Sequence, residues 1–86
     1  MIEQHFGRSL TLGVEEELMI LDGGTHAQRP ASHELIPLVH ADRGEVKTEL
    51  FQSVIELNTD VCDSPADAAG VLRGLRHATR DAAAQV

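Results

Sequence analysis

The sequence predicts an α+β fold in which a strand, a short helix, a broken strand and a longer helix follow one another. The run from Thr11 to Asp22 is apolar and β-favouring, and residues 45–59 contain two strand-like pieces. The stretch 64–67, Ser-Pro-Ala-Asp, combines an N-cap residue, a proline at the first helical position and an acid at the third. Two or three strands make only part of a sheet, so we expect a fragment of a larger fold.

The first strand is predicted over Ser9–Leu21. Because side chains alternate along a strand, Glu15 and Glu17 point to one face and Glu16 points to the other. Four apolar residues share the face of Glu16: Leu12, Val14, Leu18 and Ile20. Beyond Glu17 both parities are apolar, which predicts that this end of the strand is covered on both faces.

Three consecutive glutamates, Glu15 to Glu17, are electrostatically costly. Two unit charges 4 Å apart repel by roughly 1 kcal/mol in water and about 4 kcal/mol at a surface-like dielectric. An E-x-E pair on one strand face suits a hard divalent cation, which prefers oxygen ligands and neutralises the carboxylates. The alternative is a solvated acidic strand end, the more usual role of a run of like charges.

A turn is predicted at residues 22–25, Asp-Gly-Gly-Thr, followed by a polar loop that reaches Pro30. Ser32 is the expected cap of a short helix, which Pro37 would kink and residues 42–44 would end. The apolar residues of this helix are Leu35, Ile36, Leu38 and Val39.

Residues 45–59 also fit helical spacing, so periodicity alone leaves this segment open. We favour two strand pieces, 46–48 and 54–59, joined by a bulge or turn near residues 50–53. Glu49 and Glu56 are seven residues apart and would face opposite sides of an unbroken strand. A break between them restores a common side.

The last helix is predicted to begin after Ser64 and to pack by one apolar stripe. The stripe consists of Ala68, Val71, Leu72, Leu75, Ala78 and Ala82. The expected outward-facing residues are Arg73, Arg76, Arg80 and Asp81.

Composition limits the classes of function. The 86 residues carry fourteen acidic and seven basic side chains, a formal charge of −7, which argues against general binding to nucleic acid or anionic membrane. We find no secretory signal at the start and no apolar run long enough to span a membrane. Cys62 is the single cysteine, so no internal disulfide forms, consistent with a cytoplasmic location.

Two motifs in this order resemble one protein family. They are TLGVEEEL at residues 11–18 and GEVKTELFQSVIELNTDVC at residues 44–62, and the similarity continues through the helix after Ser64. The chain resembles the bacterial carboxylate–amine ligases related to glutamate–cysteine ligase type 2, distant relatives of glutamine synthetase. On this resemblance, residues 1–86 are the amino-terminal part of a single catalytic domain.

The resemblance implies that Glu15, Glu17, Glu49 and Glu56 are metal-binding carboxylates on an antiparallel sheet that forms one wall of a cleft. Glu16 is not carried over; we interpret it as strand filler or a local ion-pair partner. The implied cofactor is Mg²⁺, with ATP as co-substrate and amino acids as the carboxylate and amine substrates. The implied reaction passes through an acyl phosphate and needs no nucleophilic side chain. The isolated segment should be inactive without the remainder of the parent chain.

Other residues that could carry chemistry have simpler interpretations. Cys62 lacks an evident partner base, so a buried thiol is favoured over a nucleophile. The histidines lack zinc-site spacing, and Gly23-Gly24 lacks the rest of a phosphate loop. Lone basic residues that could meet an anion are usually solvated; they are Arg8, Arg29 and Lys47. The alternative function is a small acidic non-enzymatic domain that forms a homo-oligomer by strand pairing.

Overall fold

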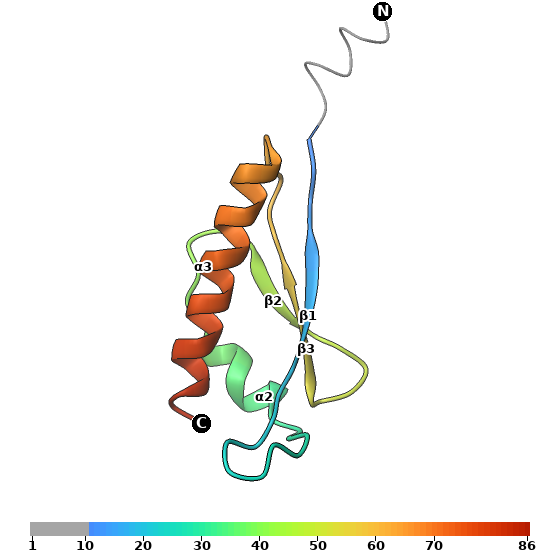
Figure 1. Cartoon of the computed structure of the whole chain (residues 1–86), viewed down its shortest axis with the longest axis vertical. Helices are drawn as coiled ribbons and strands as arrows, with labels where there is room; N and C mark the ends of the chain where they lie inside the picture. Colours follow the sequence, from blue (N-terminus) through green and yellow to red (C-terminus); the bar gives the residue numbers. More distant parts are fainter. Residues whose placement is uncertain (1–10) are drawn as a thin grey trace, which may run out of the picture.

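The computed structural model describes residues 11–86. The described part contains three strands and two helical segments, and the first helical segment continues into a 3₁₀ turn (Figure 1). The elements are β1 (Glu15–Met19), α2 (Ser32–Leu35), η1 (Ile36–Leu38), β2 (Glu45–Thr48), β3 (Val54–Asn58) and α3 (Pro65–Ala83). This order confirms the predicted α+β fold and is compatible with a fragment of a ligase fold.

The three strands form one antiparallel sheet in the order β1-β3-β2, so β3 lies in the centre. Glu56 of β3 pairs with Glu17 of β1 on one side and with Lys47 of β2 on the other. Strands β2 and β3 form a hairpin whose connection covers residues 49–53. The strand interpretation of residues 45–59 is therefore confirmed, with a turn rather than a bulge as the break.

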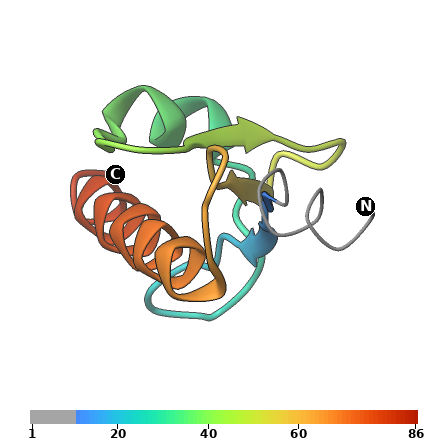
Figure 2. The same ribbon diagram turned by 90° about the horizontal axis from the view of Figure 1, so that it is seen from above.

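Helix α3 and the α2–η1 segment lie on the same face of the sheet (Figure 2). The central strand contributes Ile55 and Leu57 to the interface, where both are fully buried, as is Leu75 of α3. The buried core residues are Leu35, Ile55, Leu57, Cys62, Ala68, Val71, Leu75 and Ala82. Burial of these side chains between the sheet and the helices is the main source of stability for this small fold.

The opposite face of the sheet is open among the described residues. Met19 is 55% exposed and Phe51, in the hairpin connection, is 68% exposed. The predicted second layer over the end of the first strand is thus not supplied by residues 11–86. Leu18 and Ile20 pack against the core, because their parity points them toward α3.

The first strand is shorter than predicted. Its ladder covers Glu15–Met19, and single bridges join Leu12 to Cys62 and Leu21 to Gln28. The ladder ends before residue 15 because the hydroxyl of Thr59, rather than a backbone carbonyl, accepts from the amide of residue 14 at 2.9 Å. The predicted residues Ser9 and Leu10 lie outside the described part of the chain.

The assignment of Ser32 as a helix cap was wrong. Ala31 occupies the cap position, and its carbonyl accepts from the amides of Glu34 and Leu35 at 3.1 and 2.9 Å. Ser32 is fully buried, and its own amide donates to the carbonyl of Gln52 in the hairpin connection at 2.9 Å. The α-helical part of this segment ends before Pro37, which lies in the 3₁₀ turn instead.

The start of α3 is as predicted. The hydroxyl of Ser64 accepts from the amide of Asp67 at 3.0 Å, and Pro65 is the first helical residue.

None of the helices described in residues 11–86 has both the length and the apolar character needed to span a membrane.

Arg43 joins three segments at this end of the molecule. Its guanidinium donates to both carboxylate oxygens of Asp60 at 2.9 and 2.8 Å and to Asp67 at 2.7 Å. These bonds hold the pKa of each aspartate below its usual value. The segment before β2, the segment after β3 and the first turn of α3 are thereby held together.

Candidate metal centre

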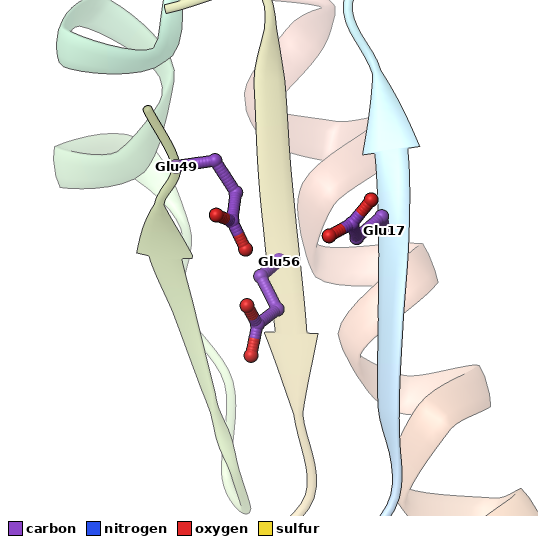
Figure 3. Close-up of side chains that lie close together, drawn as sticks. All are labelled: Glu17, Glu49 and Glu56. Atoms are coloured by element: carbon purple, nitrogen blue, oxygen red, sulfur yellow. The ribbon is translucent and has the colours of Figure 1, made fainter. Parts of the chain in front are cut away.

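Three of the four predicted metal-binding glutamates lie close together on the open face of the sheet. One carboxylate oxygen from each of Glu17, Glu49 and Glu56 lies within 4.8 Å of the others. Figure 3 shows the three side chains on β1, just beyond β2, and on β3, with helix α3 behind the sheet. The group therefore contains one acid from β1, one from β3 and one from the residue that follows β2.

Local structure explains why these side chains share a face. Glu17 and Glu56 are directly paired across β1 and β3, so their side chains project to the same side. Glu49 follows Thr48, the last residue of β2, and has the parity of Lys47, which pairs with Glu56. The hairpin thus gives Glu49 and Glu56 the common side that the sequence predicted.

Glu15 is not part of the three-carboxylate group. It pairs with Asn58, one row along the sheet, and projects to the same face as Glu17. Its charge still contributes to raising the pKa of Glu49. The structure therefore places Glu15 beside the group and leaves its metal-binding role a prediction.

Repulsion between neighbouring carboxylates dominates the electrostatics of the group. The pKa of Glu49 is raised above its ordinary value, chiefly by a hydrogen bond with the carboxyl of Glu56 and then by partial desolvation and the neighbouring negative charges. Without a cation, the neighbouring carboxylates thus disfavour the charged form of Glu49. A bound cation would offset that repulsion.

Glu16 lies on the opposite face and has a separate role. The guanidinium of Arg76 in α3 donates to both of its carboxylate oxygens, one of them at 2.7 Å. This pairing lowers the pKa of Glu16. Its exclusion from the metal-binding set agrees with the structure, and the expected local ion pair is confirmed.

The donor set fits a hard divalent cation. All three side chains offer carboxylate oxygens, and oxygens on opposite sides of Mg²⁺ are about 4.2 Å apart, twice a bond of about 2.1 Å. Glu17 is exposed, while Glu49 and Glu56 are half-buried, so small side-chain rotations can close the observed separation. A hollow of about 510 Å³ between residues 40–43 and α3 contains none of these acids. The group lies instead on an open sheet face.

Other polar residues share this face, and of these the sequence analysis did not single out Glu45. Glu45 and Asn58 pair across β2 and β3, and Lys47 pairs with Glu56. The side-chain amide nitrogen of Asn58, Nδ2, is buried without a hydrogen-bond partner. The period-2 spacing of residues 45, 47 and 49 was the available signal, once β2 was accepted as a strand.

Cys62 and the turn at residues 22–25 have the structural roles that the sequence predicts. Cys62 is fully buried, and its thiol donates to the backbone carbonyl of Asp60 at 3.3 Å. Residues 22–25 form a turn in which the Asp22 carboxylate accepts from the amides of Gly24 and Thr25, each at 2.9 Å. Among residues 11–86, no histidine belongs to a metal-type cluster of three or more ligands.

Comparison with known proteins identifies the family. Residues 11–86 match glutamate–cysteine ligase family 2 (GCS2). This chain belongs to glutamate–cysteine ligase family 2. The family resemblance predicted from the two motifs is therefore confirmed. The matched residues include every helix and strand that the structure describes.

Individual relatives agree with the GCS2 assignment. "Putative glutamate--cysteine ligase 2-1" of Rubrobacter xylanophilus is 46% identical over 77 residues, which are 87% of this chain and 20% of that protein. "Putative glutamate--cysteine ligase 2" of Leptothrix cholodnii is 41% identical over 81 residues, 92% of this chain and 22% of that protein. The chain thus spans about a fifth of the length of these relatives.

Proposed function

We propose that this chain supplies magnesium-binding carboxylates to a cytoplasmic, ATP-dependent carboxylate–amine ligase that joins glutamate to cysteine. The convergence of Glu17, Glu49 and Glu56 in a member of GCS2 is the observation that carries the proposal. The names of the relatives support the choice of substrates. Glu15, beside the group, is proposed as a fourth ligand or as a ligand to a second ion.

The proposed chemistry accounts for the residue types. Joining a carboxylate to an amine requires an activated acyl group, which phosphoryl transfer from ATP provides. That transfer depends mainly on positioning and on neutralising phosphate charge, which bound magnesium ions supply. Magnesium retains few protein carboxylates and binds largely through phosphate and water. Three acids, one exposed and two half-buried, suit that arrangement and leave room for phosphate oxygens.

The segment is expected to be inactive on its own. The relatives are about five times longer, and the open sheet face bears carboxylates without an enclosing wall within residues 11–86. We propose that the nucleotide pocket and the amine site are formed by the remainder of a longer chain.

The proposal is tested by ADP release with glutamate and cysteine in the longer protein that contains this segment. Replacing both Glu17 and Glu56 by glutamine should lower the rate at least about 100-fold, because several kcal/mol of charge stabilisation is lost. Glu34→Gln, which changes an exposed acid of α2, should leave the rate unchanged. Undiminished activity in the double variant would remove the metal assignment.

Single variants examine the role of Glu15. Magnesium affinity, measured by titration calorimetry, should fall more for Glu17→Gln than for Glu15→Gln, because only Glu17 belongs to the three-carboxylate group. Equal losses would place Glu15 among the ligands on the same footing.

A second candidate is the non-enzymatic domain that dimerises by strand pairing. Strands β1 and β2 form the two edges of the sheet. Antiparallel pairing of two β2 strands about Val46 would place Glu45 opposite Lys47, whereas pairing two β1 strands about Glu16 would oppose glutamates. Sedimentation velocity on this chain decides: a stable dimer that binds no magnesium favours this candidate, and a monomer across the micromolar range contradicts it.

A further inference from the structure

Lys47 occupies an unusual position on the open face. It pairs with Glu56 across β2 and β3, two residues before Glu49, so its side chain projects to the face that carries the three-carboxylate group. It is the one lysine or arginine in the three strands. A positive charge is thus placed at the rim of the candidate metal centre.

Lys47 does not act as counter-ion to the group. Its ammonium lies 3.3 Å from a carboxylate oxygen of Glu45. No ion pair joins Lys47 to Glu56 or Glu49, whose carboxylate oxygens lie within 4.8 Å of each other, although a lysine directly opposite Glu56 would commonly pair with it. The ammonium is therefore kept beside the carboxylates without neutralising them.

The pair with Glu45 is easily opened. Both side chains are more than half exposed, at 56% and 63%, and exposed ion pairs of this kind contribute little to stability. The flexible stem of Lys47 lets its ammonium move to a new partner on the same face at small cost.

The partner that fits is an oxyanion held by the cation. A divalent cation bound to Glu17, Glu49 and Glu56 neutralises those acids and leaves coordination positions for phosphate oxygens or water. A lysine ammonium is a common point-charge ligand of phosphate. Resting on the proposed function, we propose that Lys47 contacts a phosphate group of the cation-bound substrate.

Two binding measurements on this 86-residue chain test the inference. Electron paramagnetic resonance measures binding of Mn²⁺ alone, and calorimetry measures binding of a preformed magnesium–pyrophosphate complex. Lys47→Met should keep Mn²⁺ affinity within about twofold and weaken magnesium–pyrophosphate roughly tenfold, the loss of one charge-assisted hydrogen bond. Lys47→Arg should retain most of the affinity.

Glu45→Gln is the matched control, because it breaks the same ion pair and keeps the lysine. It should bind magnesium–pyrophosphate as well as or better than the unaltered chain, since Lys47 is released. Equal losses in Glu45→Gln and Lys47→Met would show that only the ion pair matters and would overturn the proposal.

Two further outcomes separate the inference from the proposed function. If the chain binds Mn²⁺ but Lys47→Met binds magnesium–pyrophosphate normally, the role of Lys47 is refuted and the metal centre stands. If the unaltered chain binds Mn²⁺ but not magnesium–pyrophosphate, the phosphate assignment is wrong and the metal centre stands. Absence of Mn²⁺ binding by the unaltered chain overturns both.

Discussion

Replacing Gly44 by alanine tests whether close packing between the sheet and α3 maintains the candidate metal centre. Gly44 immediately precedes β2 and has a φ of 79°, in the left-handed region. A Cβ added there would lie 2.5 Å from the backbone carbonyl oxygen of Asn58 and 2.9 Å from a methyl carbon of Leu75. Gly44→Ala must therefore strain the backbone and push β2 away from β3 or α3.

The expected loss of stability follows from these contacts. A non-glycine residue in the left-handed region costs roughly 1–2 kcal/mol, and forcing a carbon into a packed site costs typically about 1–3 kcal/mol. A reduced entropy of the unfolded chain recovers up to about 1 kcal/mol. The net loss is about 1–4 kcal/mol, a large part of the roughly 4–13 kcal/mol expected for 86 residues at ordinary stability per residue.

Urea unfolding followed by circular dichroism measures the loss. With a denaturant slope of about 1 kcal/mol per molar, the midpoint should fall by about 1 M or more. Gly74→Ala is the control: a Cβ there meets no atom within 4 Å, so the helix should gain up to about 1 kcal/mol. A midpoint for Gly44→Ala at or above that of the unaltered chain would refute the packing argument. Magnesium affinity should fall with it, because Glu49 follows the displaced strand.

Other predictions concern the helix start, the core and the carboxylate pair. Ser64→Ala removes the acceptor for the Asp67 amide and should cost about 1 kcal/mol in urea unfolding; an unchanged midpoint would contradict the cap. Leu75→Ala should cost about 2–5 kcal/mol, since this side chain is fully buried, and a loss below 1 kcal/mol would mean that the core collapses around it. Carbon-detected NMR titration should find the pKa of Glu49 above its usual value, and Glu56→Gln should lower it. Because the folded-state pKa is raised, the contribution of Glu49 to stability is present at low pH and is lost as pH rises through that pKa, so Glu49→Gln should reduce this loss in magnesium-free buffer.

Where chemistry acts between near neighbours, the sequence was a good guide. The cap at Ser64 involves a residue three positions away, and the alternation that separates Glu16 from Glu15 and Glu17 is a property of any strand. The cap prediction at Ser32 failed for a non-local reason, namely the hydrogen bond from its amide to the hairpin at Gln52.

The sequence by itself determined the order of the elements, the start of α3 and the face to which each glutamate of β1 points, because these depend on local backbone geometry. The tertiary structure alone decided which acids meet. Pairing β3 between β1 and β2 brings Glu17, Glu49 and Glu56 together, leaves Glu15 one row away and places Lys47 beside them. The register of the β2–β3 hairpin follows from its short connection at residues 49–53, whereas β1 and β3 are far apart in the sequence and their register is fixed only when one face of the sheet is buried against α3.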